Sequence, residues 1–254
     1  PKTRVILPVH IFGQCSHMEA ISELAGKYNL FVIEDTAQAL GTNYIFSDRT
    51  EKKAGTIGNI GCVSFFPSKN LGCYGDGGAI ITNDSYLAEK LNSIVNHGMS
   101  IKYHYDRVGV NSRLDSLQAA ILRVKLKHLD EYNRARQAAA EFYDAELKGS
   151  EYFDIPHRSR FSTHIFHQYT LTLKGINRKD FMEFLKSRGV PTMVYYPSPL
   201  HLQPAYSYLN YKPGDFPQTE FLCDHVVSLP MHTELENDQM RYITDTILEF
   251  VHKL

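Results

Sequence analysis

The segment Ser64-Phe65-Phe66-Pro67-Ser68-Lys69-Asn70 joins an apolar run to the glycine-rich stretch Gly72-Cys73-Tyr74-Gly75-Asp76-Gly77-Gly78. Its lysine follows a run typical of a buried strand. Glycines, which permit positive φ and close approach of the backbone to a ligand, come directly after it. Upstream, the acids of Ile33-Glu34-Asp35-Thr36-Ala37-Gln38 end a second apolar run. The two segments therefore predict an amine, a carboxylate and a hydroxyl near the ends of apolar strands, where open α/β sheets bind ligands.

The first hundred residues alternate apolar strands with helices. Four apolar runs predict strands, at Val5–Val9, Leu30–Ile33 with Glu34-Asp35 after it, Cys62–Phe66 and Ala79–Thr82. Helical spacing of apolar residues predicts helices over His17–Tyr28 and from Asn83-Asp84 onward. This order indicates an α/β fold built of βαβ units, with a mainly parallel sheet buried on both faces.

The character of the chain changes near Gly149. A long helix is predicted from Leu114 through Leu147, where Lys148-Gly149 supplies a stop signal. Beyond it we expect a smaller α+β domain. Its predicted strands are Phe166–Leu173, Val190–Tyr196 and Val226–Pro230. Its predicted helices are Asn177–Arg188, capped by Asn177, and Glu236–Leu254. The expected domains are a large one over residues 1–148, ending in a linking helix, and a small one over 149–254.

Composition excludes several classes of protein. The 254 residues carry a net charge of -1, so no bulk attraction to nucleic acid or to an anionic membrane is expected. No apolar stretch approaches the length of a membrane span, and no signal peptide is recognisable. The 4 cysteines form no Cys-x-x-Cys pair, which is typical of free thiols in a reducing compartment. We therefore expect a cytoplasmic protein that binds neither membrane nor nucleic acid.

Each candidate site residue also has an ordinary interpretation. A carboxylate at Asp35 could keep a pyridinium nitrogen protonated, although local sequence slightly favours a helix cap or a surface acid. Lys69 is suited to form an imine with a carbonyl cofactor if it is desolvated and held rigidly, whereas most lysines are solvated. Ser64 suits a phosphate and Gln38 a ring oxygen, but neither residue carries weight alone.

Motifs for other chemistries are absent from the sequence. It contains no G-x-G-x-x-G after a strand, no G-x-x-x-x-G-K-[ST] and no G-x-S-x-G elbow. His164 and His167 form a close pair, but no nearby cysteine or acid completes a metal set. We therefore predict no metal site.

Taken in order, the motifs resemble the DegT/DnrJ/StrS-type sugar aminotransferases, pyridoxal-phosphate enzymes of fold type I. The resemblance rests on His10-Ile11-Phe12-Gly13-Gln14, Glu34–Gln38, Ser64–Asn70, Gly75–Gly78, Asn96-His97-Gly98, Asn111–Asp115, Leu117–Ala120, Tyr196–Gln203 and Ser228-Leu229-Pro230. These motifs run through nearly the whole chain. The implied fold is the large domain of a fold type I transferase, in part, followed by a small α+β domain.

The resemblance implies a role for seven residues. Lys69 would be the imine-forming catalytic lysine and proton shuttle, Asp35 would pair with the pyridine nitrogen, and Gln38 would contact the ring's oxygen side. Ser64 would bind the phosphate, and Asn111 would reach the phosphate of a neighbouring subunit's cofactor in a homodimer with shared active sites. Arg113 would line that shared site, and His201 would lie near the sugar substrate.

The implied activity is transfer of an amino group from glutamate to a nucleotide-linked keto sugar, UDP- or dTDP-linked, in amino-sugar or polysaccharide biosynthesis. The segment Tyr195–His201 resembles that of enzymes acting at C3, and both 3-keto and 4-keto sugars stay open as substrates. One alternative is a sugar dehydratase of the same family, whose members carry histidine where this chain has Lys69. Another is a non-catalytic remnant with a regulatory or binding role. The resemblance also implies a further N-terminal portion, with a phosphate loop and a ring-stacking aromatic residue, before the strand at Val5.

Overall fold

The computed structural model describes residues 2–254, which form two compact units. The first unit holds the residues up to Arg134 together with 158–167, and the second holds 135–157 and 168–254. The two domains expected from the sequence, residues 1–148 and 149–254, stay a prediction. Helix α4 (Leu129–Leu147) contributes residues to both units.

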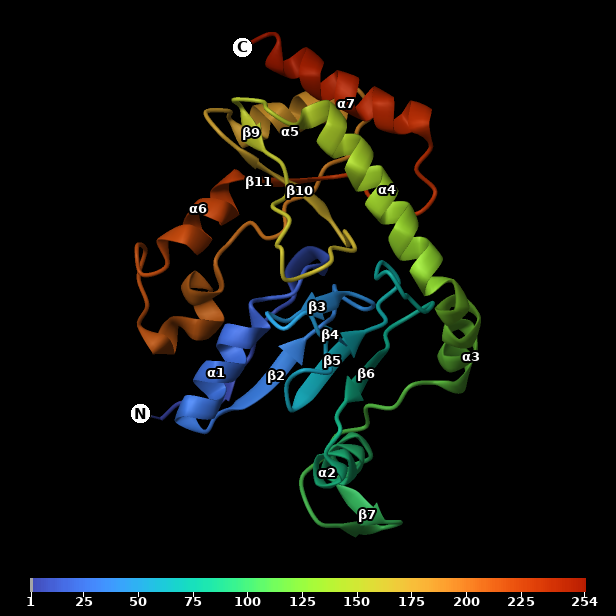
Figure 1. The fold of residues 1–254 in the computed structure, drawn as a ribbon. Coiled ribbons are helices and arrows are strands. Elements are labelled where there is room, and N and C mark those ends of the chain that lie inside the picture. The colour runs from blue at the N-terminus through green and yellow to red at the C-terminus, as the bar shows by residue number, and fades with distance from the viewer. Residues whose placement is uncertain (1) are drawn as a thin grey trace. The chain divides into compact units, whose positions relative to one another are not determined.

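The first unit is built on a four-stranded sheet in the order β1-β2-β5-β6 (Figure 1). Its strands are β1 (Val5–Ile6), β2 (Phe31–Asp35), β5 (Ile60–Ser64) and β6 (Gly78–Ile81). The pairs β1–β2 and β2–β5 are parallel, and β6 runs antiparallel to β5. The prediction of a mainly parallel sheet is confirmed, with an antiparallel strand at one edge.

Helix α1 (Met18–Tyr28) covers one face of this sheet. Its Met18 and Ala25 share a buried cluster with Val32 of β2, and Tyr44 of the hairpin β3 (Asn43–Ile45) and β4 (Glu51–Lys53) completes it. A second cluster joins Leu71 and Cys73 to Leu122 and Leu129. These belong to the glycine-rich segment, to α3 (Ser116–Lys125) and to the start of α4.

The remaining elements of the first unit are short. Helix α2 (Ser85–Val95) begins where expected, because Asp84 accepts a hydrogen bond from the Leu87 N–H. It leads into the hairpin β7 (Met99–Ile101) and β8 (His104–Tyr105), and a 3₁₀ turn at Ile11–Gly13 follows β1.

The second unit has a three-stranded antiparallel sheet in the order β11-β10-β9. Its strands are β9 (Phe153–Asp154), β10 (Tyr169–Leu173) and β11 (Val226–Leu229). Its helices are α5 (Arg178–Ser187), α6 (Pro217–His225) and α7 (Asn237–Val251), with 3₁₀ turns at Leu200–Leu202 and Pro204–Leu209. The predicted Asn177 cap of α5 is confirmed.

Two predicted strands are wrong in extent and a third is absent from the described residues, each for a backbone reason. The first strand stops at Ile6, since Pro8 has no N–H for the ladder and only Val9 bridges back to Asp35. The strand predicted at Val190–Tyr196 is absent from the described chain, where Met193 alone pairs with Ser228 beyond Pro191. Phe166 has a φ of 46° and lies outside β10.

The predicted long helix is also wrong in part. A 3₁₀ turn at Leu126–His128 separates α3 from α4. Lys125, Leu126 and Leu129 all keep right-handed helical dihedrals, so the helical path tightens by one turn rather than breaking.

Two glycines of the first unit allow a matched test of packing. A Cβ on Gly61 of β5 would lie 2.1 Å from the Gly55 carbonyl oxygen, whereas a Cβ on Gly26 of α1 would meet nothing within 4 Å. We expect Gly61→Ala to lower the free energy of unfolding by about 3 kcal/mol through overpacking. Gly26→Ala should raise it by about 1 kcal/mol through helix propensity. Urea unfolding measures both, and an equally stable Gly61→Ala variant would contradict the close approach of the two segments.

Candidate functional site

Asp35 ends β2 with its carboxylate on the sheet face opposite Glu34, because successive strand residues alternate in direction. It is in register with Cys62 of β5, so Cys62 and Ser64 lie on the same face as Asp35. Asp35 Oδ1 accepts a hydrogen bond from the Ala37 N–H at 3.0 Å. That contact holds the carboxylate at the carboxyl end of β2 in a fixed orientation.

Ser64 is the last residue of β5, and its hydroxyl oxygen accepts the Phe66 N–H at 3.3 Å. Since the oxygen serves as acceptor in that contact, its own O–H hydrogen can be donated to another group. A donor at the end of a parallel strand is suited to an anion such as a phosphate.

Lys69 lies on the turn that follows β5, with its N–H bonded to the Phe66 carbonyl at 2.8 Å. Its side chain is half-buried, unlike the exposed Phe66, Pro67 and Ser68 before it. Burial lowers the pKa of the Lys69 amine below its usual value, and the charge of Asp35 acts in the opposite direction. The amine is thus partly desolvated and within electrostatic reach of Asp35.

Gln38 lies on the turn after β2, and its amide is oriented by the backbone. Its Oε1 accepts the Phe12 N–H at 2.6 Å, from the 3₁₀ turn that follows β1. Because the oxygen faces Phe12, the other polar group of the amide is its NH₂, a hydrogen-bond donor. The predicted role of Gln38 as a donor to a ring oxygen needs that orientation.

Behind Asp35, the carboxylate of Glu34 is fully buried and accepts four hydrogen bonds. They come from His10 Nε2 at 2.9 Å and from the N–H groups of Gly55, Ile57 and Gly58 at 2.8, 2.7 and 2.6 Å. His10 Nδ1 accepts the Ser16 N–H, so Nε2 carries the ring proton and donates. We call this set of contacts the Glu34 hub.

The pKa of Glu34 reflects two opposing effects. Burial by itself raises it, but the hydrogen bonds from His10 and the three backbone groups outweigh burial and leave the pKa below the usual value. The carboxylate therefore stays ionised inside the first unit. It ties β2 to the segment before α1 and to the loop before β5.

The sequence interpretation did not identify His10 or Glu34 as site-forming residues. A signal was available, because two successive acids at the end of one strand must point to opposite faces of the sheet. One of the two was bound to face the helix-covered core and to need several donors there.

Asn111 and Arg113 lie on the segment between β8 and α3. Asn111 bridges to Asn96, just after α2, and its Oδ1 accepts a hydrogen bond from Arg113 Nε at 3.0 Å. Both side chains are exposed. The structure therefore places them together, on an exposed segment of the first unit.

His201 belongs to the second unit, and its ring is held within its own segment. Its Nε2 lies 3.0 Å from Glu220 Oε1, and its ring packs at 4.8 Å from that of Phe216. Glu220 also accepts the N–H groups of Gly214 and Phe216, which lower its pKa. These contacts show that His201 helps to stabilise the conformation of residues 200–220.

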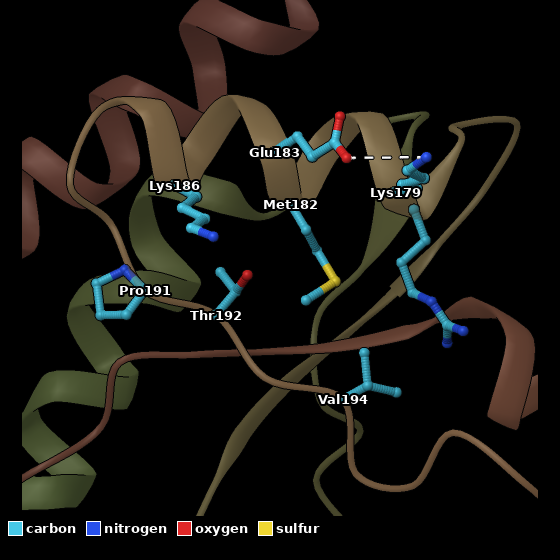
Figure 2. A pocket seen from close by; sticks show the side chains of 8 residues that line it. Lys179, Met182, Glu183, Lys186, Pro191, Thr192 and Val194 are labelled. Atoms are coloured by element: carbon cyan, nitrogen blue, oxygen red, sulfur yellow. Dashed lines mark ion pairs between the residues drawn. The ribbon is translucent and has the colours of Figure 1, made fainter.

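A recess of about 640 Å³ lies in the second unit between α5 and the segment from Pro191 to Val194. Figure 2 shows Met182 extending from α5 toward Val194. None of the seven predicted site residues lines this recess. Among residues 2–254, no helix has the length and hydropathy needed to cross a membrane, and no three histidine, cysteine or acidic side chains gather as metal ligands.

Residues 1–248 match the DegT/DnrJ/EryC1/StrS aminotransferase family. The chain belongs to this family. The resemblance seen in the sequence is thereby confirmed, and so is the α/β fold of these aminotransferases.

Similar curated proteins include one named as a regulatory protein and one named as an aminotransferase. A "pleiotropic regulatory protein" of Geobacillus stearothermophilus is 45% identical over 98% of this chain and 66% of its own length. The UDP-2-acetamido-2-deoxy-3-oxo-D-glucuronate aminotransferase of Pseudomonas aeruginosa is 42% identical over 96% and 65%. The chain thus spans about two thirds of the length of the curated relatives it matches.

Solved structures of family members agree with the fold. The crystal structure of Streptomyces venezuelae DesV in complex with a ketimine intermediate superposes with a TM-score of 0.93 at 37% identity. The match covers 100% of this chain and 67% of DesV.

The Glu34 hub predicts a pH-dependent stability. We expect Glu34→Gln to lower the free energy of unfolding at pH 7 by about 3 kcal/mol, since a buried donor set loses its charged acceptor. The pKa of Glu34 is lower in the folded protein than in the unfolded chain, where it is about 4.3. Such a carboxylate contributes its full stabilisation of the fold at any pH above the unfolded-state pKa. The contribution is lost as the pH falls through the folded-state pKa. The difference between the two proteins should therefore shrink below about pH 4.

Urea unfolding at several pH values measures this difference. Glu23→Gln, on the exposed surface of α1, is the matched control and should leave stability within about 0.5 kcal/mol of the original. A Glu34→Gln variant as stable as that control at pH 7 would contradict the hub.

Proposed function

We propose that this chain carries the cofactor-binding face of a pyridoxal-phosphate-dependent aminotransferase acting on a nucleotide-linked keto sugar. The observation that carries the proposal is the setting of Lys69, a half-buried amine whose pKa is lowered by burial and which lies within electrostatic reach of Asp35. A lysine that reacts with a carbonyl must be neutral for part of the time, and desolvation favours the neutral form.

The residues on this face suit pyridoxal phosphate. Asp35, fixed by the Ala37 N–H, would hold the ring nitrogen protonated, and the Ser64 hydroxyl would donate to the phosphate. Gln38 would present its amide NH₂ to the ring's oxygen. When bound, the cofactor supplies an aldehyde for the lysine amine and a ring that withdraws electrons from the carbon being changed.

Lys69 has two duties in this proposal. Its neutral amine would hold the cofactor, and its free amine would act as a base that moves a proton on the substrate side. Both duties need an amine with a depressed pKa, so the same burial supports both. The presence of lysine at this position also favours transamination over the dehydration carried out by family members with histidine there.

The substrate class follows from family membership and from similar enzymes. The 3-oxo sugar nucleotide named for the Pseudomonas aeruginosa relative supports a ketone at C3 of a UDP-linked sugar, with dTDP-linked sugars as the alternative. Glutamate is the proposed amino donor. Because the chain spans about two thirds of the length of this relative, the activity of the whole protein is part of the proposal.

We further propose a homodimer with shared active sites. Asn111 and Arg113 are exposed and paired, and apolar side chains exposed nearby include Ile101, Val108 and Leu117. An exposed apolar surface around paired polar residues is typical of an interface. In a dimer, Asn111 would reach the neighbouring subunit's phosphate, and Arg113 would line the same site. His201 would lie near the sugar, positioned by Glu220.

A non-catalytic regulatory protein is the second candidate. The name of the Geobacillus stearothermophilus relative favours it. The two candidates differ in one property, because a regulatory remnant has no use for a selectively reactive Lys69.

We expect selective covalent labelling of Lys69. Purified protein is incubated with pyridoxal phosphate at pH 7.5, reduced with borohydride and digested, and labelled lysines are quantified by peptide mass spectrometry. Lys69 should label about tenfold faster than the exposed lysines, because burial lowers the pKa of its amine and leaves more of it neutral at this pH. Its advantage should be greatest near neutral pH and shrink as the pH rises.

Lys69→Ala should abolish the dominant labelled peptide, whereas Lys27→Ala, on the exposed end of α1, should leave it unchanged. Labelling spread evenly over the lysines would support the regulatory candidate. A panel of UDP- and dTDP-linked 3-keto and 4-keto sugars, assayed with glutamate, then identifies the substrate.

A further inference from the structure

Asn70 follows Lys69 directly and points into the interior of the first unit. Its side chain is 8% exposed, whereas Phe66, Pro67 and Ser68 on the same turn are exposed. It is therefore a polar residue through which the lysine turn is anchored to the core, beside the apolar contacts of Leu71 and Cys73.

Three hydrogen bonds are made by the Asn70 amide, and a fourth orients its partner Asn133. Nδ2 donates to Asn133 Oδ1 at 2.8 Å and to the Ile165 carbonyl at 3.4 Å. Oδ1 lies 3.1 Å from His167 Nδ1, and Asn133 Nδ2 in turn donates to the Leu40 carbonyl at 3.2 Å. We call these contacts the Asn70 network.

The direction of every bond in the Asn70 network is determined by its two backbone ends. The Leu40 carbonyl only accepts, so Asn133 turns its NH₂ toward it and its oxygen toward Asn70. Asn70 must then present its own NH₂, which also suits the Ile165 carbonyl. Its oxygen is left facing His167 Nδ1, which donates. An acceptor-only group at position 70 would face two further acceptors.

The partners of Asn70 come from distant parts of the chain. Asn133 is on α4, and His167 and Ile165 lie in a segment whose N–H groups bond to Phe12 and Gly13. Gly41 makes room for Asn133, since a Cβ there would lie 2.6 Å from Nδ2. The Asn70 network thus joins the lysine turn to α4 and to the turn whose Phe12 N–H orients Gln38.

The rest of the turn is held by its own backbone and by the packing of Leu71 and Cys73 against Leu122 and Leu129. A Cβ on Gly72 would lie 2.3 Å from the Pro67 carbonyl oxygen, and the Cys73 N–H bonds to the Phe65 carbonyl. These contacts close the loop on itself. They do not determine how deeply the loop places Lys69 against the sheet.

We propose that Asn70 is a positioning residue for Lys69, acting through the backbone to hold the amine in its half-buried place near Asp35. This inference rests on the proposed function of Lys69. A purely structural asparagine would contribute stability alone. A positioning residue also changes the reactivity and the pKa of the neighbouring amine in protein that is still folded.

Asn70→Asp and Asn70→Ser together test the role. Asn70→Asp keeps the shape and replaces the donor by an acceptor, but it adds a charge beside Lys69, whereas Asn70→Ser removes the amide donor without adding charge. The readout is the rate of pyridoxal-phosphate labelling of Lys69 relative to exposed lysines in the same digest, measured against pH in folded protein. We expect that rate to fall about tenfold and the apparent pKa of Lys69 to move up toward that of exposed lysines. Asn133→Leu, which leaves Asn70 its Ile165 contact, should have a smaller effect in the same direction.

Ser162→Ala is the matched control for lost stability. Its hydroxyl is buried and bonded to the Cys15 N–H at 2.9 Å, and it belongs to the Tyr44 side of the first unit rather than to the Asn70 network. It should lower stability and leave the relative labelling of Lys69 unchanged. Asn70→Ser, which adds no charge beside Lys69, should give the same direction of change and is the deciding variant if Asn70→Asp does not fold.

The outcomes separate the two proposals. If the original protein shows no preference for Lys69, the proposed function fails and the positioning role fails with it. If Lys69 is preferred but the folded Asn70 variants label it at the original rate and pH, only the positioning role is overturned. A shift in Ser162→Ala equal to that of Asn70→Asp would also overturn it.

Discussion

The buried carboxylate of Glu34 is the constraint on which the geometry of the first unit depends. An ionised group inside a protein is costly unless every lone pair finds a donor, and Glu34 finds four. Three of those donors are backbone groups of residues 55–58, so the loop must lie against β5. That in turn requires glycine at position 61, where the Gly55 backbone takes the place of a side chain.

Strand geometry transmits this constraint to the opposite face of the sheet. With Glu34 held on one side, Asp35 must face the other, in register with Cys62 and beside the strand that ends at Ser64. The Asn70 network plays the corresponding part for Lys69. Asp35 and Lys69 are therefore each preceded or followed by a residue buried in a polar network, which gives a short loop the rigidity of the core.

Local patterns predicted much of this arrangement. Apolar runs located β2, β5 and β6, capping residues located the starts of α2 and α5, and ordered motifs identified the family. Local sequence patterns did not predict the tertiary contacts. Asn70 meets partners at positions 133, 165 and 167, and no local pattern indicates that a residue beside an exposed turn is buried. Pro8 and Pro191 did carry a readable signal, since each removes an N–H from a predicted strand.

The burial of the Lys69 amine within electrostatic reach of Asp35 is the central claim, and the titration of that amine tests it most directly. Lysine side-chain NMR on the 254-residue chain, assigned by Lys69→Ala, gives the pKa in the original protein and in Asp35→Asn. The account predicts that Lys69 titrates below the other lysines and that Asp35→Asn lowers its pKa further, because the carboxylate's opposing charge is gone. A Lys69 that titrates with the exposed lysines, or that does not respond to Asp35→Asn, would contradict it.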